Sequence, residues 1–207
     1  MPASDAQDSG TDQTTEVISL KYRMKAGKLY LGNDLLVQSK GRMVSPGKII
    51  CDREGRELLY TEIFQKDADA SETGDMQGKA SSSAEYRDIS LRRYLLRKMD
   101  GSVCTSAAPF YAAEERLPEN GFPVCRMPRV DHALMEIQGK TCVLIREKWG
   151  EYVLQDAGGQ VLMQIRYTGA LGRQYEINTF STWKPEMIAG IVQLSHYMER
   201  ESEFLNV

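Results

Sequence analysis

Short stretches in which apolar and polar residues alternate make up much of this chain. From Val161 to Tyr167 a large apolar residue occupies every second position. A period of two places successive side chains on opposite faces of a β-strand, so one face is packed and the other is partly exposed to solvent. Glycine turns separate such stretches, and Asp100-Gly101 lies between two apolar runs, which is typical of a β-hairpin. The pattern predicts a succession of antiparallel hairpins.

Two of the predicted hairpins resemble each other. An apolar pair is followed by Asp-x-x-Gly, a polar residue and an apolar strand, first at Asp52–Gly55 and again at Asp156–Gly159. The aspartate can hydrogen-bond to its own turn, and the glycine adopts a positive φ without steric cost. A hydrogen-bonded turn therefore explains both motifs, and calcium binding is not needed to account for them. Their likeness predicts a duplication, with halves near residues 17–112 and 130–207.

The segment from Pro185 to Glu201 has a different pattern. Its apolar side chains surround most of the circumference of a helix, leaving a narrow polar stripe of Glu186, Gln193, His196 and Arg200. An amphipathic surface helix is apolar on one stripe only, so we expect this helix to be enclosed by protein. It is too short and too polar to span a bilayer. Gly190 in its middle disfavours a helix, which suggests close backbone approach there.

Three irregular segments interrupt the pattern. Residues 1–16 are polar and acidic and predict a disordered tail, and residues 67–84 have the same character and predict a flexible insert. Residues 113–129 contain three prolines and are interpreted as a link between the halves. The chain should therefore form one domain over residues 17–207.

The composition of the chain limits the classes of function that it can have. Of the 207 residues, 42% are hydrophobic and 27% charged, with a net charge of −3, as in ordinary globular proteins. No overall basic field favours nucleic acid. The cysteines are far apart and have no histidine near them, which predicts buried thiols and no metal site. With no signal peptide or long apolar run, we expect a cytoplasmic protein.

Together these features resemble the tubby C-terminal-like superfamily, which includes the LURP-one-related proteins and the phospholipid scramblases. The likeness is carried by IICDREGRELLYTEIF, YLLRKMDGSVCTSAAPF and EYVLQDAGGQVLMQIRY with the following RQYEINTFSTWKPEMIAGIVQLSHYM. The resemblance implies a mainly β fold: a closed antiparallel barrel of two similar halves around one buried hydrophobic C-terminal helix, residues 185–201. Ile188, Ile191, Val192 and Leu194 would then be core.

Catalytic signatures are absent from the sequence. It has only two histidines, His132 and His196, and both are interpreted as local or structural. No nucleophile elbow, Walker loop or dinucleotide fingerprint occurs. We therefore expect no enzyme and no cofactor.

The densest basic cluster is YRDISLRRYLLRK, with Arg87 at its start and Arg92, Arg93, Arg97 and Lys98 as the candidate anion- or headgroup-binding residues. As a strand, it would place Arg93 and Arg97 on one face and Arg92 and Lys98 on the other. As a helix, the basic residues would flank an apolar stripe instead. Arginine matches phosphate geometry, although a solvated charged face explains the same pattern.

Two functions of different class follow. The resemblance implies a non-enzymatic module that binds phosphate or phospholipid headgroups, or tethers to membrane, with anionic lipid as partner and a peripheral location at the inner membrane. The alternative is an intracellular scaffold that binds a protein partner through the acidic tail, the proline-rich link or an exposed strand edge. A basic cluster on the barrel wall would favour the first, and a contiguous apolar patch the second.

Overall fold

The structure is a computed structural model that describes residues 19–42, 47–65, 92–111, 130–148, 150–169 and 174–201. The tail predicted at residues 1–16, the insert at 67–84 and the proline-rich link at 113–129 lie outside these residues. Arg87 and Cys125 also lie outside them.

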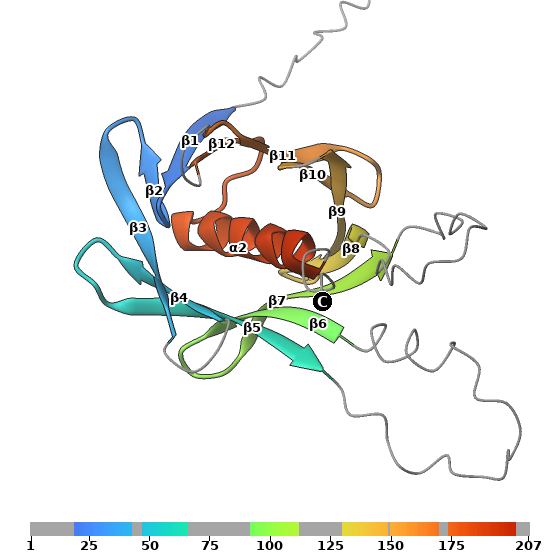
Figure 1. Cartoon of the computed structure of the whole chain (residues 1–207), viewed down its shortest axis with the longest axis horizontal. Helices are drawn as coiled ribbons and strands as arrows, with labels where there is room; N and C mark the ends of the chain where they lie inside the picture. Colours follow the sequence, from blue (N-terminus) through green and yellow to red (C-terminus); the bar gives the residue numbers. More distant parts are fainter. Residues whose placement is uncertain are drawn as a thin grey trace, which may run out of the picture.

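Twelve antiparallel strands form a closed barrel (Figure 1). Each strand pairs with the next along the chain, and β12 pairs with β1, so that Met24 lies opposite Tyr175 where the barrel closes. The strands are β1 Leu20–Lys25, β2 Lys28–Leu31, β3 Asp34–Gly41, β4 Lys48–Asp52, β5 Glu57–Gln65, β6 Arg92–Lys98, β7 Val103–Tyr111, β8 Val130–Ile137, β9 Lys140–Lys148, β10 Glu151–Asp156, β11 Val161–Tyr167 and β12 Gln174–Thr179. The predicted fold class is confirmed.

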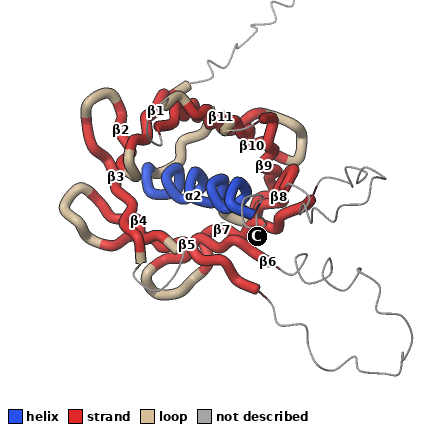
Figure 2. The backbone as a smooth tube through the Cα atoms, in the orientation of Figure 1, coloured by secondary structure: helices blue, strands red, loops and turns tan. Residues whose placement is uncertain are grey.

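The helix α2, Pro185–Glu201, runs through the inside of this barrel (Figure 2). Side chains alone fill a barrel of about eight strands, whereas a wider barrel leaves interior space. Here α2 occupies that space. The four residues expected in the core, Ile188, Ile191, Val192 and Leu194, have no solvent exposure, which explains why the helix is apolar around most of its circumference.

Gly190 marks the closest approach of α2 to the barrel wall. A Cβ atom added to Gly190 would lie 2.4 Å from Cδ2 and 3.2 Å from Cγ of Leu96 on β6, closer than non-bonded carbon atoms pack. Leu96 is itself fully buried. The close approach expected from the sequence is therefore present.

The two Asp-x-x-Gly turns have equivalent hydrogen bonds and lie six strands apart, between β4 and β5 and between β10 and β11. In the first, Gly55 N–H donates to the Asp52 carbonyl and Arg56 N–H to the Asp52 carboxylate. In the second, Gly159 N–H donates to the Asp156 carbonyl and the N–H of the following residue to the Asp156 carboxylate. This spacing matches two halves of six strands each.

Because the strands alternate in direction, their ends form two rims. At one rim β1, β3, β5, β7, β9 and β11 end, and we call it the pocket rim. At the other, the hairpin rim, lie the tight turns after β2, β4, β6, β8 and β10. The chain reaches α2 from the hairpin rim, after β12, so the second half of the helix lies toward the pocket rim.

Candidate functional site

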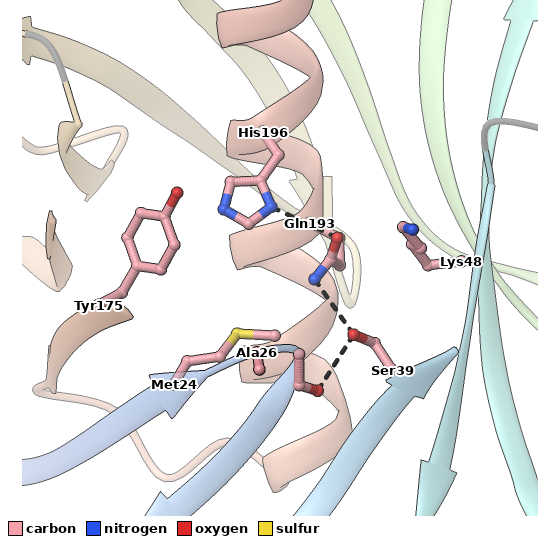
Figure 3. A pocket seen from close by; sticks show the side chains of 8 residues that line it. Met24, Ala26, Ser39, Lys48, Tyr175, Gln193 and His196 are labelled. Atoms are coloured by element: carbon pink, nitrogen blue, oxygen red, sulfur yellow. Dashed lines mark hydrogen bonds between the residues drawn. The ribbon is translucent and has the colours of Figure 1, made fainter. Parts of the chain in front are cut away.

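A pocket of about 200 Å³ opens at the pocket rim, between α2 and the wall formed by β12 and β1 to β4 (Figure 3). It is lined by Met24, Ala26, Gly27, Ser39, Lys48, Tyr175, Gln193 and His196. Drug-sized ligands occupy pockets of about 300–1,000 Å³. The pocket is therefore suited to a small group such as one phosphate with part of the moiety that carries it.

The helix side of the pocket is polar. Gln193 and His196 are 5% and 8% exposed, one turn apart on the same face of α2. His196 Nδ1 lies 3.4 Å from Gln193 Oε1, and Gln193 Nε2 lies 3.5 Å from Ser39 Oγ. The His196 ring also packs against the Tyr175 ring at a centroid distance of 4.8 Å. At these distances the hydrogen bonds are weak.

The β1–β2 turn shapes the opposite wall. Ala26 and Gly27 both have positive φ, 49° and 79°, as in the tight turn that suits a two-residue hairpin. Ser39 N–H and the Ser39 hydroxyl both donate to the Gly27 carbonyl, at 2.7 and 3.1 Å. A Cβ at Gly27 would lie 2.6 Å from Ser39 Oγ, so glycine allows this turn to reach the pocket.

Lys48 carries a formal positive charge at the pocket, and its backbone is linked to the helix through Thr61. The Lys48 N–H donates to Thr61 Oγ1 at 2.9 Å, and Thr61 Oγ1 hydrogen-bonds to the Tyr197 hydroxyl at 2.6 Å. Burial raises the pKa of Tyr197, although the Thr61 hydrogen bond opposes the shift. The phenol therefore stays neutral and fixes the start of β4 against α2.

The lining favours an anion over a cation. The described residues of the lining combine the Lys48 ammonium with the amide, imidazole and hydroxyl groups of Gln193, His196, Ser39 and Tyr175, and none of them is a carboxylate. Ammonium groups do not bind metals, and the described residues contain no group of three or more His, Cys, Asp or Glu side chains placed to hold a metal ion. Hydrogen-bond donors around a lysine are the groups that bind phosphate oxygens.

The basic residues singled out in the sequence lie elsewhere, on β6. Of the two alternatives left open, the strand is the one observed. Arg92 and Lys98 lie on the same face of β6 as the buried Tyr94 and Leu96. Arg93 and Arg97 lie on the opposite face, which is the outer wall of the barrel.

Arg92 and Lys98 are at opposite ends of β6, separated by roughly 20 Å of extended chain. Arg97 Nε pairs with Glu62 Oε2 at 3.0 Å, and its guanidinium also donates to the Gly101 carbonyl. The four side chains are thus distributed over two faces and two rims, and none of them lines the pocket. Their role in anion binding stays a prediction.

The remaining sequence candidates have local roles. His132 Nδ1 lies 3.1 Å from Asp131 Oδ2, and its ring stacks on Phe110 at 4.9 Å. Cys51 and Cys142 are buried thiols and Cys104 is half-buried; burial raises the pKa of all three.

The sequence did not predict the pocket, although the polar stripe on the helix contained a partial signal. Gln193 and His196 lie on that stripe, and the structure turns them toward the pocket. Ser39 and Lys48 gave no signal, because they line one pocket with Gln193 and His196 only once the barrel closes around α2.

No protein-family model matches the chain, and no curated protein matches it either. Among the described residues, the structure has no helix of the length and apolarity needed to cross a bilayer.

Proposed function

We propose that this protein binds a phosphate-bearing headgroup, without catalysis, in the pocket between α2 and β1 to β4. The observation that carries the proposal is the composition of the pocket: Lys48 and the polar side chains of Ser39, Tyr175, Gln193 and His196 line one small space, and none of the described lining residues is a carboxylate. The resemblance to tubby-like proteins supports the same class of ligand. The size of the pocket favours a headgroup over an acyl chain.

The test is binding of soluble headgroups, inorganic phosphate and inositol phosphates, followed by calorimetry and by amide shifts in NMR spectra. We expect Lys48→Ala to weaken binding about tenfold to hundredfold, as expected for loss of a hydrogen bond between charged groups. Lys28→Ala is the matched control, because Lys28 is exposed on the outer wall beside the same turn. Absence of binding, or equal weakening by both substitutions, would overturn the proposal.

The scaffold alternative loses one of its three supports. Each described strand of the closed barrel is paired on both sides, so a partner cannot add a strand to a free edge. The acidic tail and the proline-rich link lie outside the described residues. What favours a partner is apolar exposure on the outer wall, where Phe110 and Leu134 are 42% and 41% exposed.

A further inference from the structure

Three hydrogen bonds in the pocket form a chain whose direction can be assigned. The Ser39 hydroxyl donates its single proton to the Gly27 carbonyl at 3.1 Å, so its oxygen can only accept from Gln193 Nε2, which lies 3.5 Å away. The Gln193 amide is thereby oriented with its oxygen toward the helix neighbour. His196 Nδ1 lies 3.4 Å from this oxygen (Figure 3).

This direction determines which imidazole nitrogen of His196 carries the proton. The amide oxygen of Gln193 accepts hydrogen bonds and cannot donate them, so a neutral His196 holds its proton on Nδ1. The other tautomer would place two lone pairs against each other across the same 3.4 Å. Nε2 is then the basic atom of the ring. In Figure 3 it lies on the side of the ring toward Tyr175, whose own ring packs at a centroid distance of 4.8 Å.

His196 is also suited to titrate near neutral pH, because histidine is the side chain whose charge ordinarily changes between about pH 5 and 8. Ammonium, guanidinium and phenol groups titrate well above that range and carboxyl groups below it. Burial raises the pKa values of Tyr22, Tyr152 and Tyr197 further. Among the described residues, the other ionisable groups on or facing the second half of α2 are of these kinds: Tyr22, Arg42, Lys48, Tyr94, Tyr152, Tyr175, Tyr197, Glu199 and Arg200.

A bound anion would favour the charged form of the His196 ring. Lys48 lines the same pocket, and its ammonium group disfavours a second positive charge nearby. A phosphate group in the pocket attracts both charges, and a protonated Nε2 can donate a charge-assisted hydrogen bond to a phosphate oxygen. Protonation and anion binding therefore strengthen each other by the same factor.

We propose that His196 takes up a proton from solvent on Nε2 when the phosphate-bearing headgroup binds, so that the pocket holds this ligand more tightly as the pH falls from about 8 to about 6. The inference rests on the proposed function, because it concerns the same pocket. It gives the bound phosphate two positive partners, Lys48 from the barrel wall and the His196 imidazolium from the helix.

The first experiment follows the two histidine rings of the full chain by NMR, with nitrogen shifts that distinguish both neutral tautomers from the imidazolium. In the free protein at about pH 8 we expect His196 in the Nδ1–H form. Saturation with inositol phosphate at constant ionic strength should raise the titration midpoint of His196 by about one pH unit or more. His132 is the internal control: it lies on β8, paired with Asp131, and does not line the pocket, so its midpoint should stay in place.

The second experiment measures binding as a function of pH. The ligand is glycerophosphoinositol, because a phosphodiester does not titrate in this range, and the buffers are two phosphate-free ones of different ionisation enthalpy. We expect calorimetry to show proton uptake with the ligand and roughly tenfold tighter binding at about pH 6 than at about pH 8, since a shift of one pKa unit corresponds to a tenfold change in interaction. His196→Gln should lose this pH dependence, and the matched variant His132→Gln should keep it.

The outcomes separate the two proposals. If soluble headgroups bind while the His196 ring keeps the same midpoint, or is already charged before ligand is added at about pH 8, the proton coupling is overturned and the proposed function stands. Equal midpoint shifts in His132 and His196 would also overturn it, because they would reflect a general effect of the added anion. If neither inorganic phosphate nor inositol phosphates bind, the proposed function and the proton coupling are both overturned.

Discussion

At the scale of single residues, the hairpin turns depend on carboxylates that accept backbone hydrogen bonds. Asp156 Oδ1 accepts the N–H groups of Gly158 and Gln160, both at 2.9 Å, and Asp100 Oδ1 accepts the Ser102 N–H at 2.8 Å. Such bonds favour the ionised carboxyl. The hydrogen bonds from the Ser102 side chain and backbone hold the pKa of Asp100 below its ordinary value.

This shift predicts an acid-dependent loss of stability. The folded-state pKa of Asp100 is below the ordinary value of 3.8. The stabilisation is therefore complete above 3.8 and is lost as the pH falls through the folded-state pKa. Asp100→Asn cannot titrate, so calorimetric melts of this variant should show a smaller drop in Tm between neutral pH and pH values below 3.8. An equal drop in both proteins would contradict the assignment.

At the scale of elements, the packing of α2 on β6 predicts a reversal of the usual helix rule. Gly→Ala inside a helix normally stabilises by about 0.5–1 kcal/mol. At Gly190 the new methyl group would overlap Leu96, and overpacking of this kind costs about 1–3 kcal/mol. We expect Gly190→Ala to lower the free energy of unfolding measured in urea.

Combining Gly190→Ala with Leu96→Ala tests whether contact with Leu96 causes the destabilisation. Leu96→Ala alone should destabilise by about 2–5 kcal/mol, because it leaves a cavity. In that background the added methyl group at Gly190 meets no leucine, so Gly190→Ala should become stabilising. If Gly190→Ala had the same sign in both backgrounds, contact with Leu96 would not be the reason for the glycine.

The elements themselves were predictable because their signals are local. Strand alternation, the turns at Asp52 and Asp156, and the all-round apolar pattern of Pro185–Glu201 are each contained in a few consecutive residues. The secondary structure of the YRDISLRRYLLRK segment was not predictable, because its basic residues fit both the period of a strand and that of a helix. Its pairing with β5 and β7, which is a long-range interaction, makes it a strand.

At the scale of the whole molecule, barrel closure creates the pocket. Ser39 and Gln193 are 154 residues apart in the sequence, and Met24 meets Tyr175 only where β1 pairs with β12. No local pattern encodes such a meeting, and the candidate anion-binding residues taken from the sequence lie on β6, away from the pocket. The same closure makes α2 the common core of both halves.

This dependence predicts that the barrel cannot fold without its helix. Ile191 is fully buried in the centre of α2, and a carboxylate there would be charged and unpaired in an apolar interior. We expect Ile191→Asp to give no native near-ultraviolet dichroism and no dispersed NMR spectrum. Leu134→Asp places the same charge on the outer wall, where Leu134 is 41% exposed, and should fold normally. A soluble Ile191→Asp variant with an unchanged melting curve would mean that the strands can fill the barrel without α2, which contradicts the argument that twelve strands enclose more space than their own side chains occupy.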